Sequence, residues 1–245
     1  MSVDVVVDVG NSRIKWGRCD AGGIRAAAAL PMNSAAWQAQ IAAWDLTGPA
    51  RWVIAGVRPE WRDALAAWLA TQGFDVYLLE SARQLPLRVK LEYSERVGID
   101  RLLNAVAANS RRRPGQAALA VDAGSAVTVD YVDPDGAFCG GAIFPGLRLM
   151  TQSLHEYTAL LPLVEITGAV APPGTDTRSA IATGVYHAVA GGIRALSDAM
   201  TGAAAEVTTF VTGGDARLLA SSLGDHVVLW PEMTLEGIRL SFASA

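Results

Sequence analysis

The sequence has little of several features that mark common classes of protein. Only two of its 245 residues are cysteine, Cys19 and Cys139, which is too few for a disulfide framework and gives no metal-ligand spacing. Acidic residues outnumber basic ones and the net charge is −4, so the bulk charge does not predict nucleic-acid binding. No apolar run reaches the ~18 residues typical of a membrane-spanning helix. With few cysteines and no signal-peptide pattern, we expect a reduced, cytoplasmic protein.

Two common nucleotide-binding signatures are also missing. The sequence contains neither a Walker-A motif nor a Gly-x-Gly-x-x-Gly fingerprint, so any nucleotide site must use another architecture. What the sequence does have is apolar content: 51% of its residues are hydrophobic and 18% are charged. These proportions predict a globular chain with a substantial core, arranged as one large domain or as two of ordinary size.

Two short stretches of the chain share one pattern. In the first, an apolar strand ends at Asp8, a turn follows at Gly10-Asn11-Ser12, and a second strand leaves it. In the second, a strand ends at Asp122, a turn follows at Gly124-Ser125, and another strand begins. The two aspartates are 114 positions apart, close to half of the 245 residues. We therefore expect two related domains, residues 1–114 and 115–245.

Strand and helix patterns alternate in both halves. In the first half we expect strands at 3–9, 14–18, 24–30, 51–55 and 75–79 and helices at 34–44, 59–71 and 102–110. In the second half we expect strands at 117–122, 125–132, 137–144, 206–211 and 226–230 and helices at 146–157, from a cap at 175 or 176 to about 200, at 215–222 and at 233–241. Each half opens with three strands, and this alternation predicts an α/β layered fold.

The two turns are suited to phosphate. Glycine lets the backbone N–H groups approach a phosphate closely, and the side chains of Asn11, Ser12 and Ser125 can add donors. Lys15 can reach a phosphate oxygen as a point charge. A carboxylate beside a phosphate is repelled unless a cation lies between them. Asp8 and Asp122 therefore suit a hard cation such as Mg²⁺, bound directly or through water.

Five segments occur in an order that resembles a known family. They are Asp8-Val9-Gly10-Asn11-Ser12, Gly98-Ile99-Asp100-Arg101, Asp122-Ala123-Gly124-Ser125-Ala126, Gly140-Gly141-Ala142-Ile143-Phe144-Pro145-Gly146 and Thr177-Arg178-Ser179-Ala180-Ile181. This set resembles the type III pantothenate kinases, which belong to the superfamily of acetate and sugar kinases, Hsp70 and actin. The resemblance implies two duplicated actin-like (ribonuclease H-like) α/β domains with a cleft between them.

The resemblance also implies an activity and its site. It implies ATP-dependent phosphorylation of pantothenate to 4′-phosphopantothenate, the first step of coenzyme A biosynthesis, by a homodimer that uses Mg²⁺ and a monovalent cation, K⁺ or NH₄⁺. By this resemblance Asp100 is the general base and Asp122 holds the monovalent cation. The ATP contacts it implies are Asp8, Gly10, Asn11, Ser12, Lys15, Gly124 and Ser125. The pantothenate contacts it implies are Tyr93, Gly98, Ile99, Asp100, Arg101 and Thr177.

The residues alone leave alternatives open. Asp100-Arg101 is also what a helix N-terminal charge followed by a surface arginine would give, and without the ordered motifs that interpretation is the stronger one. The fold does not fix the substrate, so another small-molecule kinase is the first alternative function. The second is a catalytically inactive relative that acts as an accessory transcription regulator. The presence of Asp8, Asp100 and Asp122 together argues against it.

Overall fold

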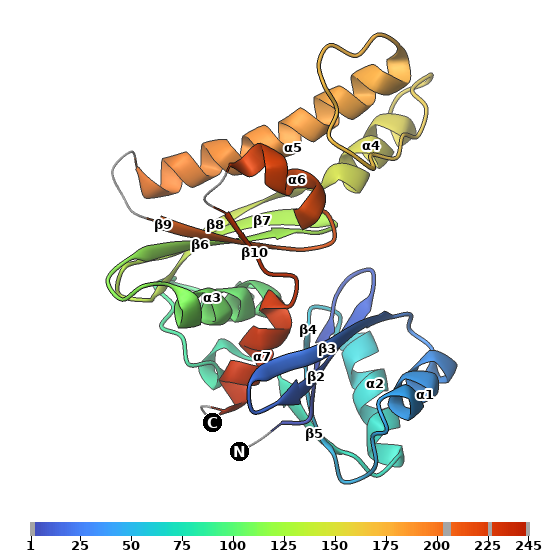
Figure 1. The fold of residues 1–245 in the computed structure, drawn as a ribbon, viewed down its shortest axis with the longest axis vertical. Helices are drawn as coiled ribbons and strands as arrows, with labels where there is room; N and C mark the ends of the chain where they lie inside the picture. The colour runs from blue at the N-terminus through green and yellow to red at the C-terminus, as the bar shows by residue number, and fades with distance from the viewer. Residues whose placement is uncertain (1–2, 203–206, 225–226, 244–245) are drawn as a thin grey trace. The chain divides into compact units, whose positions relative to one another are not determined.

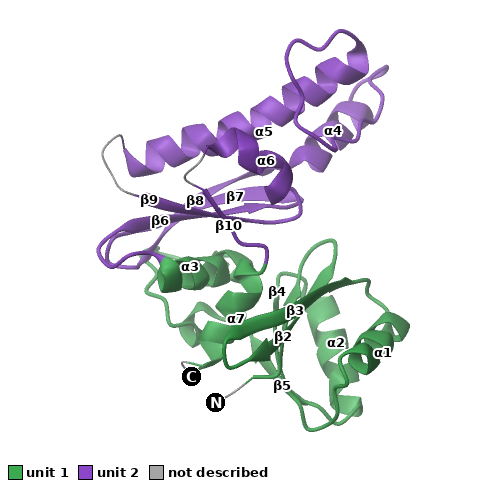
Figure 2. Ribbon diagram, in the orientation of Figure 1, with its two compact units in different colours: residues 1–111, 232–245 green, residues 112–231 purple. Residues whose placement is uncertain are grey.

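The structure is a computed structural model of the chain and describes residues 3–202, 207–224 and 227–243. The chain divides into two compact units, coloured separately in Figure 2. The first comprises residues 1–111 and 232–245, and the second comprises residues 112–231. Within the described part of the chain, no helix combines the length and the apolar character needed to cross a bilayer.

The first unit is built on a five-stranded mixed sheet. Its strands are β1 (Val5–Val9), β2 (Ile14–Asp20), β3 (Gly23–Leu30), β4 (Arg51–Gly56) and β5 (Asp75–Leu79), in the order β3-β2-β1-β4-β5. The pairs β1–β2 and β2–β3 are antiparallel hairpins, whereas β4 and β5 continue the sheet in parallel. In Figure 1, helices α1 (Ser34–Ala43) and α2 (Pro59–Thr71) cover one face. Helices α3 (Ile99–Arg111) and α7 (Met233–Ala243) cover the other.

The alternation of side chains along β1 decides which face Asp8 occupies. Val5, Val7 and Val9 lie in the apolar core formed with α1 and α2. Successive strand residues point to opposite faces, so Val6 and Asp8 point toward α3 and α7. Gly17 on β2 supports this assignment, because a Cβ there would lie 3.1 Å from Val6 and 3.2 Å from Leu235 of α7.

The second unit repeats this sheet. Its strands are β6 (Ala117–Ala123), β7 (Ala126–Val132), β8 (Phe138–Pro145), β9 (Val207–Thr212) and β10 (Val227–Leu229), in the order β10-β9-β6-β7-β8. Again the first three strands are antiparallel neighbours and the last two join in parallel. The helices are α4 (Leu147–Glu156), α5 (Thr177–Thr201) and α6 (Ala216–Leu223). The predicted α/β architecture with a duplicated sheet is confirmed.

Most predicted elements agree with the structure to within a residue or two, but three points differ. Helix α3 begins at Ile99 and not at 102, which places Asp100 in its first turn. Two short 3₁₀ helices, η1 (Ala82–Gln84) and η2 (Ser94–Arg96), lie in a stretch for which the sequence predicts no helix or strand. Helix α7 belongs to the first unit, whereas the sequence-based division assigned it to residues 115–245. Glu206 and His226, with which two predicted strands begin, lie outside the described residues.

Candidate active site

The loop between β1 and β2 is a short, closed turn. The N–H of Gly10 donates to the carbonyl oxygen of Arg13 at 3.1 Å, which closes the turn. A Cβ at Gly10 would lie 3.2 Å from that oxygen, so a larger residue would crowd the turn. Asn11 and Ser12 are exposed at its tip. The turn therefore presents backbone and small polar side chains to solvent, as phosphate binding requires.

Asp8 and Lys15 face each other across the hairpin. They are direct partners in the antiparallel register of β1 and β2, so both side chains lie on the face covered by α3 and α7. Asp8 is only 7% exposed. The end of β4 lies close to the end of β1, because a Cβ at Gly56 would be 2.5 Å from both the Cβ and the carbonyl oxygen of Val9. Only glycine permits this approach.

Asp100 occupies the first turn of α3, and its carboxyl group has a perturbed pKa. Burial raises this pKa above its ordinary value, while the N–H of Arg101 and the charges of Arg101 and Lys15 oppose the rise. The N–H of Arg101 donates to Asp100 Oδ1 at 2.8 Å. A Cβ at Gly98 would lie 2.6 Å from the same oxygen, which explains glycine there. A Cβ at Gly98 would also lie 3.8 Å from Val57, whose N–H donates to Val9 of β1, so the start of α3 lies beside the end of β1.

The second hairpin has a comparable turn that is buttressed by glycines. The N–H of Gly124 donates to Ala126 at 3.2 Å, and the N–H of Gly146, at the start of α4, donates to Ser125 at 3.0 Å. A Cβ at Gly146 would lie 2.3 Å from the carbonyl oxygen of Gly124. Ser125 itself is exposed. A turn held from both sides keeps its exposed groups in one arrangement.

Asp122 lies one strand position before the end of β6, under a close backbone approach. Gly213 follows β9 with φ of 101°, and a Cβ there would be 2.5 Å from Asp122 Oδ1 and 2.4 Å from the backbone of Ala123. This spacing requires glycine both for its conformation and for its size. The carboxylate is thus covered on one side by main chain.

The described residues contain no group of three or more His, Cys, Asp or Glu side chains that could hold a metal ion. A cation at either hairpin would therefore be bound by one or two carboxylates together with water or phosphate oxygens. Mg²⁺ is commonly bound in this way, so the donor set of Asp8 fits it.

One family of proteins matches most of the chain. The family model described as type III pantothenate kinase matches residues 5–199. The chain belongs to the type III pantothenate kinase family. A type III pantothenate kinase from Porphyromonas gingivalis is 31% identical over 243 residues, which cover 98% of this chain and 97% of the relative. As a member of this family, the protein uses ATP to phosphorylate pantothenate for coenzyme A biosynthesis.

Solved structures show the fold of the kinase. A Campylobacter jejuni protein assigned to the Baf family of transcriptional activators has a TM-score of 0.65 at 18% identity, with 98% of both chains covered. The ADP-bound MreB5 of Spiroplasma citri has a TM-score of 0.52 at 10% identity, with 98% of this chain and 96% of that chain covered. The fold is thus the actin-like one, with two related α/β domains.

The structure brings some of the predicted site residues of the kinase together. Asp8, the 10–12 turn, Lys15 and Asp100 converge on one part of the first unit. Tyr93 is 49% exposed at the start of η2, where Arg96 stacks 4.6 Å from its ring centre and a hydrogen bond with Glu92 raises its pKa.

Gly98, Ile99 and Arg101 flank Asp100 in the first unit, and the other predicted residues of the kinase lie in the second unit. Asp122, Gly124 and Ser125 form the second hairpin, and Thr177 is the exposed first residue of α5. The cap of that helix is Asp176, which accepts hydrogen bonds from the N–H groups of Arg178 and Ser179. Thr177 thus stands on a firmly capped helix end.

Sequence reasoning missed two residues of the kinase. The N–H of Asp215 donates to the carbonyl oxygen of Ala123 at 2.9 Å, and burial raises the pKa of its carboxyl group. Arg58, at the end of β4, donates to the carbonyl oxygen of Asn11 in the first turn. Asp215 directly follows Gly213-Gly214, and that pair was its only local signal. Arg58 has none, because only the pairing of β1 with β4 brings it to the turn.

Proposed function

We propose that Asp100 is the general base of pantothenate phosphorylation and that the hairpin from Asp8 to Lys15 binds the phosphates of ATP. The observation that supports this proposal is the position of Gly98, two residues before Asp100: a Cβ there would lie 3.8 Å from Val57, whose N–H donates to Val9 just before the exposed turn at Gly10–Ser12. The primary hydroxyl of pantothenate attacks the γ-phosphorus, and Asp100 accepts its proton late in the transfer. Lys15 and the turn N–H groups stabilise the charge that develops on the phosphate oxygens. Asp8 would hold Mg²⁺, which neutralises phosphate charge when bound.

The pantothenate contacts are proposed from the resemblance to the family, and Gly98, Ile99 and Arg101 are neighbours of Asp100 in the chain. Arg101 is next to the base, and its guanidinium can pair with the carboxylate of pantothenate through two parallel hydrogen bonds. Gly98 and Ile99 supply backbone beside the base, and Tyr93 and Thr177 complete the proposed contacts. Because a carboxylate partner positions the far end of the substrate, its hydroxyl can be held in line with the γ-phosphate.

Asp122 is proposed to bind a monovalent cation, K⁺ or NH₄⁺, and Gly124 and Ser125 to contact ATP. A large monovalent cation needs several oxygen ligands at relaxed distances, which a carboxylate beside main-chain carbonyls can supply. Replacement of K⁺ by Na⁺ should lower kcat/KM for ATP in the wild-type protein and should have little further effect on Asp122→Asn. Equal rates of the wild type in both salts would remove this assignment.

The kinase is proposed to work as a homodimer through the segment around α4. Tyr157 and Leu160 are 83% and 91% exposed there, and Leu149 and Leu163 are also exposed. Apolar side chains gathered on one segment are typical of an association surface. Light scattering should give twice the 25.7 kDa chain mass, and Leu160→Ser should shift the mass toward that of one chain. A wild type that stays at one chain mass would contradict the dimer.

The proposed base is tested by Asp100→Asn. The asparagine keeps the shape and the acceptor for the Arg101 N–H but cannot take a proton. With ATP, Mg²⁺, K⁺ and pantothenate, kcat should fall by about 10²- to 10⁴-fold, while the Kd for ATP should change less than about threefold. Equal loss of ATP binding and turnover would instead make Asp100 a structural or phosphate-binding residue. Turnover of another alcohol but not of pantothenate by the wild type would point to a different kinase.

A further inference from the structure

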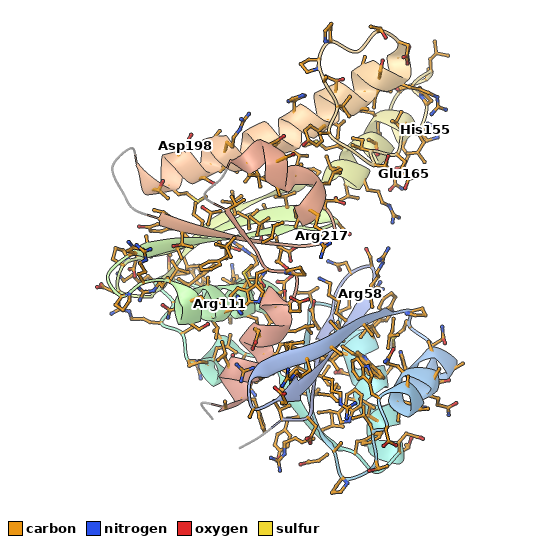
Figure 3. All side chains as sticks on the ribbon, in the orientation of Figure 1. Arg58, Arg111, His155, Glu165, Asp198 and Arg217 are labelled. Carbon is orange, nitrogen blue, oxygen red and sulfur yellow. The ribbon has the colours of Figure 1, made fainter. Side chains whose placement is uncertain are left out.

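Arg58 is an uncompensated cation beside the phosphate turn. It is the last residue before α2, and its Nη1 donates to the carbonyl oxygen of Asn11 at 3.3 Å. Its guanidinium carbon lies 3.8 Å from the ring centre of Trp61, one turn further along α2. Figure 3 shows Arg58 beside the β1–β2 loop. Among the described residues, no carboxylate forms an ion pair with it.

The backbone places this arginine with little freedom. The N–H of Val57 donates to the carbonyl oxygen of Val9 at 3.1 Å, which continues the β1–β4 pairing to the edge of the turn. Gly56 permits the close strand approach described above, and Pro59 starts α2 directly after Arg58. The side chain makes no capping hydrogen bond to α2. The guanidinium is therefore directed to the turn by main-chain geometry and not by the needs of the helix.

Stacking on Trp61 leaves most donors of Arg58 available. A guanidinium has five N–H groups, and one of them serves Asn11. A ring face attracts a cation electrostatically and occupies the flat side of the guanidinium, while the N–H groups at its edge stay open. A fork of N–H donors held in this manner matches the spacing of phosphate oxygens.

We propose that Arg58 binds the β- and γ-phosphates of ATP and stabilises the phosphoryl group during transfer, as a second cation beside Lys15. This inference rests on the proposed assignment of the Asp8–Lys15 hairpin to ATP. Lys15 lies across the hairpin from Asp8 on the same face of the sheet, whereas Arg58 reaches the tip of the turn from just beyond β4. The two cations thus approach the turn from different strands. Trp61 is a positioning residue that holds the guanidinium in place.

Arg58 also has a purely structural interpretation, in which its bond to Asn11 only pins the turn. Two conservative variants separate the interpretations. Arg58→Gln keeps an N–H donor for Asn11 but removes the charge, and Arg58→Lys keeps the charge but loses the fork. Phosphate binding predicts that kcat/KM for ATP falls by about 10- to 100-fold in Arg58→Gln and by less in Arg58→Lys. A pinning role needs only one N–H donor to Asn11, which both variants can supply, and therefore predicts little loss in either of them.

Three further measurements complete the test. In Arg58→Ala, millimolar guanidinium should restore part of the lost kcat/KM, and Kd should rise more for ATP than for AMP. Trp61→Leu should raise the KM for ATP by a smaller factor. Arg25→Ala, which removes an exposed arginine of β3 that pairs with Asp20, is the matched control and should behave as wild type. Melting temperatures of all variants exclude misfolding as the cause.

The outcomes distinguish this inference from the proposal on which it rests. If Lys15→Ala weakens ATP binding but Arg58→Gln retains wild-type kinetics, only the role of Arg58 is wrong. If Lys15→Ala and Arg58→Gln both leave ATP kinetics unchanged, the hairpin is not the phosphate site, and both proposals fail. Equal loss of ATP and AMP affinity in Arg58→Ala would also overturn the phosphate contact.

Discussion

The carboxyl group of Asp100 is subject to opposing effects. Burial disfavours its charged form, while the N–H of Arg101 and the cations Arg101 and Lys15 favour it. The net result is a pKa above the ordinary value of a free aspartate. A proton acceptor gains from this, since a more basic carboxylate takes the proton of an alcohol more readily. In the folded protein the ionised carboxylate is poorly solvated, and this cost lowers the free energy of unfolding.

This cost predicts that Asp100→Asn stabilises the protein as it inactivates it. A folded-state pKa above the unfolded value means that stability falls as pH rises through the folded pKa, because the native state then loses a proton that it bound more tightly. At pH 8 the neutral variant should melt higher than the wild type, on the order of 2–4 °C, and near pH 4 the difference should shrink. Calorimetry at both pH values checks this.

A matched control for this prediction is Asp198→Asn, on the exposed side of α5. It removes a carboxylate that is already well solvated, so its melting temperature should follow that of the wild type at both pH values. A lower melting temperature of Asp100→Asn at pH 8 would mean that the ionised carboxylate stabilises the fold, and the conflict described for Asp100 would not exist.

Local sequence could predict some residues of the site and not others. The opposition of Asp8 and Lys15 follows from a hairpin, whose register is set by a turn only a few residues long. Asp100 lacked a local signal of its own and came only from the ordered family motifs. The contact of Arg58 with Asn11 depends on parallel pairing between β1 and β4, which are separated in the chain by two strands and a helix, and no local pattern encodes it. Residues that meet across such crossovers are therefore the ones missed.

Helix α3 carries Asp100, and α7 sets the position of α3. A Cβ at Gly237 would lie 2.0 Å from the carbonyl oxygen of Leu103, so the two helices touch along their main chains. Beside this contact, Thr234 Oγ1 donates to Asn104 Oδ1 at 2.8 Å, and both residues are buried. Asn104 lies one helical turn after Asp100. The helix pair thus fixes Asp100, the proposed base, through packing on the backbone.

Gly237→Ala should therefore damage both stability and turnover. The methyl group meets main-chain atoms that cannot rotate away, so α7 must shift from α3, at a cost of about 1–3 kcal/mol in unfolding free energy. Because α3 moves with respect to the sheet, kcat should fall more than the KM for ATP rises. Urea denaturation and steady-state kinetics measure the two effects.

Gly191→Ala is the control for that substitution. Gly191 also lies inside a helix, α5, but a Cβ there meets nothing within 4 Å. Alanine should add up to about 1 kcal/mol of stability through helix propensity and leave turnover unchanged. If Gly237→Ala is as harmless as Gly191→Ala, the α3–α7 contact is looser than its geometry indicates.

At the scale of the whole chain, the duplicated sheets are predictable from the sequence. The final helix is predictable too, but the unit that it joins is not. Strand and helix periods, glycine turns and Pro59 locate nearly every element, and the repeated order of three strands indicates the duplication. An amphipathic period says that a helix has an apolar face but not which sheet receives it. Helix α7 ends the second half in sequence, yet it covers β1 and α3 of the first unit.

The first unit is therefore completed only by the last part of the chain. Val6, Val53 and Ala55 lie on the sheet face toward α3 and α7, and all three are fully buried. Truncation after Pro231 removes α7 and exposes part of this face, so the protein should aggregate or lose activity. Truncation after Ala243 keeps α7 and serves as the control, with wild-type solubility expected. Soluble yield and resistance to proteolysis measure the difference. A truncated protein that stays soluble and protease-resistant would show that the first unit folds without its last helix.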